Sequence, residues 1–223
     1  MHMSDGLLNA PTSVAFLVVA AVGVGIALVK ARADLDDRTA PMAGLVATFV
    51  FAVQMINFPI LPGASGHLLG GALAAILVGP WVGALCVTIV LAVQALLFAD
   101  GGLTALGTNV TNMALIGTAA GFAVAVALRG LANRGKGGLA LVAFLSALIN
   151  TLLAATGFVV EYAIGGQGGV EIGKVAVLML GLHALIGIGE GLITAATVTS
   201  VAAIRPDLVH LLKDNRKPLE VRS

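Results

Sequence analysis

Apolar residues along this chain occur in long runs separated by short clusters of glycine, proline and charged residues. A helix needs about 20 mainly apolar residues to cross the hydrocarbon core of a bilayer. Dividing the chain at these clusters predicts seven spans, of which the third is short, ends at Gly79-Pro80, and is expected to tilt or to follow a loop buried in protein. The spans are expected near residues 13–29, 40–56, 67–79, 81–98, 108–131, 139–162 and 174–204.

This pattern predicts an all-α fold, a polytopic transmembrane bundle of about seven helices. Residues 1–204 are expected to form one membrane domain, with residues 1–12 as a separate N-terminal segment and residues 205–223 as a cytoplasmic tail. Of the 12 lysines and arginines, three follow the first span, three the fifth and five the seventh, so only Lys174 lies on the other side. The positive-inside rule then predicts an N-terminus outside and a C-terminus in the cytoplasm.

Composition excludes several other classes of protein. The chain is 59% hydrophobic and 10% charged, whereas a soluble domain has about 25% charged residues. The net charge of +1, without a basic tract, gives no indication of a nucleic-acid partner. No phosphate-binding loop and no His-Glu-x-x-His motif occurs, so we expect neither ATP hydrolysis by this chain nor enzymatic activity.

The first apolar run also allows a cleaved signal peptide as an interpretation. The basic region of a signal peptide should precede its apolar run, but Lys30 and Arg32 follow it. We therefore expect a retained helix, so that the preceding residues MHMSDGLLNAP remain part of the mature protein.

The first two residues offer metal-binding chemistry. A free α-amine followed by histidine supplies three nitrogens in one plane: the Met1 amine, the His2 amide nitrogen and His2 Nδ1. Planar nitrogen coordination suits Ni(II) or Cu(II). His67, expected on the same outer side, is the candidate for the fourth donor. The alternative interpretation is a solvated, disordered terminus, because chain ends are generally mobile.

Four stretches of the sequence carry a family resemblance that runs from Met1 to about Thr194. They are MHMSDGLL at the start, SGHLLGG around His67, QALLFADGGLTALGTNVTNM and HALIGIGEGLIT. With these motifs the chain resembles the CbiM/NikM family, the substrate-specific (S) components of energy-coupling-factor (ECF) transporters for cobalt and nickel. The chain departs from the family pattern at Met3 and Ser4, neither of which supplies a planar ligand.

The resemblance implies both a site and partners. It implies that Met1, His2 and His67 are the ligands of a transported Ni(II) or Co(II) ion, without a resident cofactor. It further implies a transmembrane coupling (T) subunit, two cytoplasmic ATPase (A) subunits and, in many cobalt members, a small accessory membrane subunit. The expected location is a prokaryotic plasma membrane, with a link to cobalamin biosynthesis. The residues do not decide between nickel and cobalt, although four planar nitrogens favour nickel.

Several polar residues are candidates to support the ligands. Asp5 is a candidate to orient the histidine ring, although an Asp-Gly pair is also typical of a turn. Asn57 and Ser65 lie in the same predicted outer loop as His67. Further polar residues of the motifs are expected to shape a lid or the path of the ion, or to satisfy exposed backbone groups; these are Gln94, Asp100, Asn109 and Asn112.

His183 and Glu190 lie seven residues apart, on one face of the last predicted span. Ionisable residues inside a membrane often have a function. One interpretation is therefore a self-sufficient secondary metal/proton transporter that uses this pair. Polar contacts between helices are the other interpretation. Secondary transporters commonly contain inverted repeats, and the sequence shows no persuasive repeat. A membrane scaffold without a ligand is the third alternative.

Overall fold

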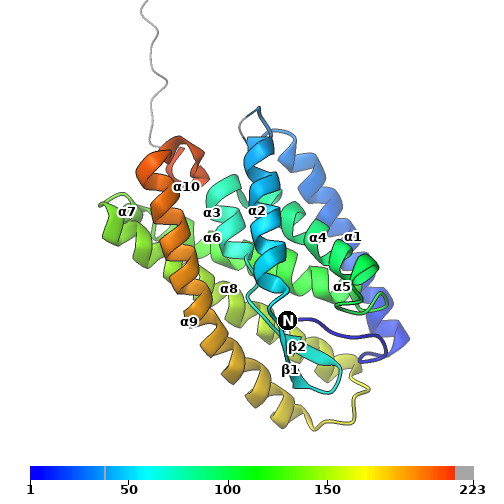
Figure 1. Ribbon diagram of the computed structural model, residues 1–223. Coiled ribbons are helices and arrows are strands. Elements are labelled where there is room, and N and C mark those ends of the chain that lie inside the picture. Colours follow the sequence, from blue (N-terminus) through cyan, green and yellow to red (C-terminus); the bar gives the residue numbers. More distant parts are fainter. Residues whose placement is uncertain (38, 214–223) are drawn as a thin grey trace, which may run out of the picture.

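Five helices in the computed structural model, which describes residues 1–37 and 39–213, are long and apolar enough to cross a membrane. They are α1 (Ala10–Ala31), α4 (Pro80–Leu97), the continuous helix Leu106–Ala127, α8 (Lys136–Gly165) and α9 (Ile172–Ile204). The 18 residues of α4, the shortest of these, extend about 27 Å. Figure 1 shows α8 and α9 as the longest elements, lying side by side along the bundle. The predicted all-α membrane fold is confirmed.

Shorter elements complete the bundle. The 16-residue α2 (Thr39–Gln54) is apolar but shorter than a usual span. The helix Leu106–Ala127 consists of α5 (Leu106–Asn109), a π-helical stretch η1 (Val110–Gly117) and α6 (Thr118–Ala127). The remaining short helices are α7 (Arg129–Ala132), the 3-10 helix η2 (Pro206–Leu208) and α10 (His210–Lys213).

The third predicted span was wrong as a transmembrane helix. Only α3 (Gly71–Val78) is helical there, and its eight residues extend about 12 Å, less than half of a bilayer core. Gly70 and Gly79 limit it at both ends, because each has a positive φ that interrupts an α-helix. All eight residues are buried, so α3 is a short helix enclosed by protein and is reached through a non-helical segment.

A small β-hairpin occupies the region that the sequence indicated as an outer loop. Strands β1 (Phe58–Leu61) and β2 (Ala64–Gly66) pair antiparallel, and Gly63 in the turn adopts φ +78°. The N-terminal residues lie along this hairpin. Ser65 N donates to His2 O at 3.1 Å and Ser4 N donates to Gly63 O at 2.9 Å. The chain terminus is therefore held by backbone hydrogen bonds (Figure 1).

The described basic residues other than Lys174 lie toward the end of the bundle where α1 ends and where α7 and α10 are found (Figure 1). Lys213 there donates to Thr39 at 3.4 Å. The predicted tail is not separate from the bundle at its start, because Val209 and Leu211 are buried in its apolar core. Residues outside the described part of the chain also contribute to the predicted positive side; these are Arg38, Arg216, Lys217 and Arg222.

Candidate metal centre

The three residues expected to hold a metal lie together inside the protein. Met1, His2 and His67 are 1%, 3% and 1% exposed. The imidazole rings of His2 and His67 have centroids 4.4 Å apart, with their planes tilted by 39°. The terminus is thus buried and ordered, in contrast to the solvated terminus of the alternative interpretation.

Asn109 fixes the N-terminal segment from the side opposite to the hairpin. Met3 N donates to Asn109 Oδ1 at 2.8 Å, and Asn109 Nδ2 donates to Met3 O at 3.1 Å. Gly102 N also donates to Met3 O, at 2.8 Å. The segment is therefore held between the β-hairpin and residues 101–109, which sets the position of the Met1 amine and of the His2 backbone.

The carboxylate beside the His2 ring belongs to Asp100. Asp100 Oδ1 lies 3.0 Å from His2 Nδ1, while Asp100 Oδ2 accepts a hydrogen bond from Asn57 Nδ2 at 2.7 Å. Asn57 thus supports the site through Asp100. Gln94, buried in α4, also lies beside the His2 ring. Asp100 and His2 are 98 residues apart, and the sequence predicted for Asp100 only a place in a lid or along the path of the ion, or a bond to exposed backbone.

Two candidate supporting residues take other roles. Asp5, expected to orient the histidine ring, instead accepts hydrogen bonds from Thr104 N at 2.7 Å and Thr104 Oγ1 at 2.6 Å. Asp5 therefore joins the N-terminal segment to the loop that precedes α5. Ser65 contributes through its backbone N–H, which bonds to His2 O. Asp100 therefore replaces Asp5 as the carboxylate that orients His2.

The His67 ring presents one nitrogen without a partner. His67 Nδ1 lies 2.7 Å from the carbonyl oxygen of Leu68, so Nδ1 carries the proton and donates it. The Nε2 lone pair is then available, and within the described residues this buried atom has no hydrogen-bond partner. Buried polar atoms normally have a hydrogen-bond partner, so a buried atom without one is a candidate to bind a ligand.

Burial favours the neutral forms of the three bases of this centre, the Met1 amine and the two imidazoles. It lowers the pKa of the Met1 α-amine well below the ordinary value of 8.0. It also lowers the pKa of His67 well below 6.5, and that of His2 below 6.5 despite the hydrogen bond that His2 donates to Asp100. The cause is desolvation, which disfavours the protonated, charged form of each base. At neutral pH the Met1 amine and His67 Nε2 therefore offer lone pairs, whereas His2 Nδ1 donates its proton to Asp100.

A polar cavity of about 580 Å³ leads to His2 from the hairpin side of the protein. Its lining includes Asn57, Asp100 and Ser65. Across residues 1–37 and 39–213, no group of three or more histidine, cysteine, aspartate or glutamate side chains is placed to hold a metal. Metal binding at this centre would thus depend on backbone nitrogens together with two imidazoles.

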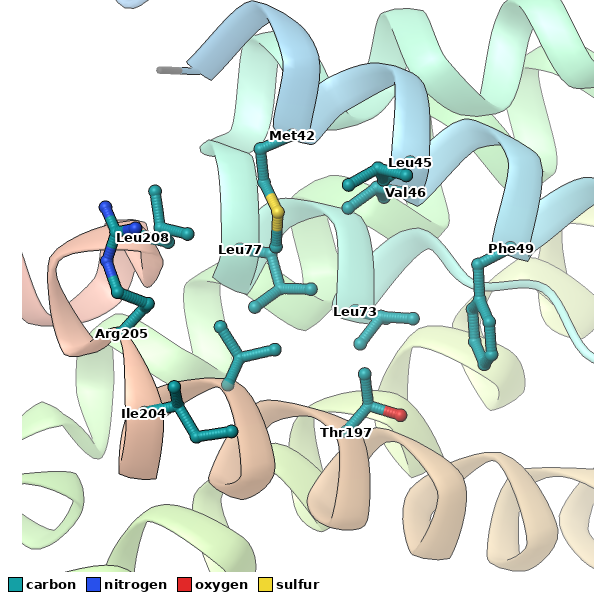
Figure 2. A pocket seen from close by; sticks show the side chains of 11 residues that line it. Met42, Leu45, Val46, Phe49, Leu73, Leu77, Thr197, Ile204, Arg205 and Leu208 are labelled. Atoms are coloured by element: carbon teal, nitrogen blue, oxygen red, sulfur yellow. The ribbon is translucent and has the colours of Figure 1, made fainter.

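A second cavity, of about 440 Å³, lies between α2 and α9, with Leu73 and Leu77 of α3 in its wall (Figure 2). Apart from Thr197 and Arg205, its lining is apolar, and it contains neither histidine nor carboxylate. This groove does not suit a metal cation, because it offers none of the nitrogen or carboxylate donors that such ions prefer.

Comparison with known proteins shows family similarity along nearly the whole chain. A family model described as "cobalt uptake substrate-specific transmembrane region" (CbiM) matches residues 2–208. A putative metal transport protein of Haloquadratum walsbyi is 41% identical over 96% of both chains. A putative fused nickel transport protein NikMN of Archaeoglobus fulgidus is 40% identical over 94% of this chain and 68% of its own length.

Solved structures agree with this fold. A crystal structure described as a truncated transition metal transporter superposes with a TM-score of 0.81 and 26% identity. The superposition covers 91% of this chain and 99% of that one.

The cobalt transport protein CbiM of Sorangium cellulosum is a further relative in sequence, 31% identical over 96% of both chains.

Proposed function

Because this chain belongs to the CbiM family and is therefore a membrane component of cobalt or nickel transport, we propose that it captures Ni(II) or Co(II) at the outer face as the S component of an ECF-type importer. The observation that carries this proposal is the burial of Met1, His2 and His67 in one place, with His67 Nε2 unbonded among the described residues. The decisive test is nickel and cobalt titration of the purified protein.

In the proposed site, three donors come from the chain terminus and the fourth from His67. The Met1 amine, the His2 amide nitrogen and His2 Nδ1 form fused chelate rings around the ion, and His67 Nε2 completes a plane. His2 Nδ1 is bonded to Asp100 in the structure. For Nδ1 to bind the ion, its proton moves to His2 Nε2, which has no hydrogen-bond partner among the described residues. The Asp100 carboxylate then remains beside the ion as a balancing negative charge. The planar donor set favours nickel.

Metal binding at pH 7 is expected to release about one proton, from the His2 amide, because burial already keeps the amine and both imidazoles neutral. A free Met-His peptide should release more, since its amine is still protonated at that pH. As the pH falls through the lowered pKa values of the site, affinity should decrease more steeply. Calorimetry in buffers of different protonation enthalpy measures the count, and release of two or more protons at pH 7 would contradict the buried-base arrangement.

The energy source is proposed to lie on partner subunits. Within the resemblance, a T subunit and two A subunits supply ATP hydrolysis, and a small accessory membrane subunit joins them in many cobalt members. We expect these subunits to co-purify with the chain from native membranes, and nickel uptake into vesicles to require the A subunits. Uptake by the purified chain alone under a proton gradient would instead support a secondary transporter that uses His183 and Glu190.

A further inference from the structure

The segment that carries His67 is buried without being helical. Residues 67–70 connect β2 to α3, and Leu69 is fully buried. Gly70 adopts φ +80°, and a Cβ placed there would lie 2.7 Å from Val50. Backbone groups in such a segment lack the regular partners of a helix, and leaving them unbonded in the interior is costly. Their partners therefore determine where His67 lies.

Glu190 on α9 supplies two of these partners. Its Oε2 accepts a hydrogen bond from Leu69 N at 2.7 Å, and its Oε1 accepts one from Gly70 N at 2.9 Å. The carboxylate is 2% exposed. A side chain whose two oxygens accept from two successive backbone N–H groups fixes that backbone, because losing either contact would leave a buried N–H group unpaired.

The Glu190 carboxylate is itself held from α8. Asn150 Nδ2 donates to Oε1 and Thr151 Oγ1 donates to Oε2, each at 3.0 Å. From α2, Gln54 Nε2 donates to Leu69 O at 2.6 Å. Side chains of α2 and α9 thus hold the segment 67–70, and Glu190 joins the segment to the α8–α9 pair.

The other donors are held by different parts of the protein. Met1 and His2 are positioned by the hairpin and by Asn109 at the end of α5. His67 follows the hairpin directly, but its carbonyl-side neighbours are bonded to α9. The alignment of the fourth donor with the first three therefore depends on the Glu190 contact.

We propose that Glu190 is a positioning residue for metal binding: it holds His67 in register with Met1 and His2 and thereby links the fourth donor to the α8–α9 pair. This inference rests on the proposed function. Glu190 does not need to touch the ion, since its effect passes through the backbone of Leu69 and Gly70. Loss of a partner that orients a metal ligand typically lowers metal affinity 10- to 100-fold.

The test is a double-mutant cycle with nickel titration in detergent. Glu190→Gln should lower affinity about 10- to 100-fold in the wild-type background and should have no further effect in the His67→Ala background. Glu161→Gln is the matched control: Glu161 is 1% exposed, lies on α8 and accepts its hydrogen bond from Asn112. The nickel affinity of Glu161→Gln should equal that of the wild type. Thr151→Val, which removes one donor to Glu190, should show a smaller decrease that again requires His67.

An equal loss in both backgrounds, or no loss in the wild type, would overturn the proposal. Thermal unfolding of each variant identifies a general loss of structure. Deuterium exchange at the amides of Leu69 and Gly70, measured without metal, tests whether Glu190 holds this backbone. The exchange rate should increase in Glu190→Gln but not in Glu161→Gln. An unchanged rate in Glu190→Gln would also overturn the proposal. If His67→Ala alone leaves nickel affinity unchanged, the ligand assignment fails, while accelerated exchange in Glu190→Gln would still establish that Glu190 holds this backbone.

Discussion

Nickel affinity is expected to fall by more than about 100-fold when the α-amine of Met1 is acetylated, because the chelate loses its first nitrogen. Loss of residues that only support a ligand typically costs 10- to 100-fold, and loss of a ligand should cost more. The amine also anchors the ion while the His2 amide loses its proton, so two donors depend on it. Calorimetric titration of the acetylated and free proteins measures the difference.

An N-terminal fusion that can be removed to leave Met1 first provides the matched control. The fused protein should bind nickel as poorly as the acetylated protein, and cleavage should restore affinity in the same sample. A C-terminal fusion should have no effect. Extension by several residues is preferable to a single added residue, since a histidine in third place can form a different four-nitrogen chelate. Full affinity in the fused or acetylated protein would contradict the proposed ligand set.

Replacement of His67 by alanine is expected to lower nickel affinity by more than about 100-fold, because His67 is itself a ligand, and to abolish the absorption band of a planar four-nitrogen site. His67 Nε2 is the fourth donor in the proposed plane, and water would take its place. Met1 and His2 remain, so weak binding should persist. Titration followed by absorption measures both quantities.

His210→Ala is the control for His67→Ala. His210 lies in α10, and its ring is near Phe122 at the basic end of the protein, away from Met1 and His2. Its replacement should leave both affinity and absorption unchanged. If both histidine variants lost affinity equally, a general effect on folding would explain the result better than loss of a ligand.

The sequence predicted the membrane fold well because long apolar runs leave few other choices. It failed at α3, where an apolar stretch indicated a span and the structure has eight helical residues. Hydropathy reports burial, and α3 is buried by protein as completely as it would be by lipid. Gly70 and Gly79 were the available signal for the limits of this helix, since both interrupt it with positive φ.

The candidate ligands were also accessible from sequence, because the chelate of Met1 and His2 is local. The residues that surround these candidate ligands could not be predicted from the sequence. Asp100 reaches His2 across 98 residues, and Asn109 reaches Met3 across 106. The carboxylate nearest to His2 in sequence, Asp5, bonds to Thr104 instead. Contacts of this kind depend on how loops meet in space, and a hydropathy pattern contains no information about that.

Coordination of nickel by the chain terminus is the central claim, and X-ray absorption spectroscopy of the purified, nickel-loaded protein tests it most directly. We predict a planar site with four nitrogen donors, which changes when the Met1 amine is acetylated. A six-coordinate site rich in oxygen, or a planar spectrum unaffected by acetylation, would contradict the claim and would place the transported ion elsewhere in the protein.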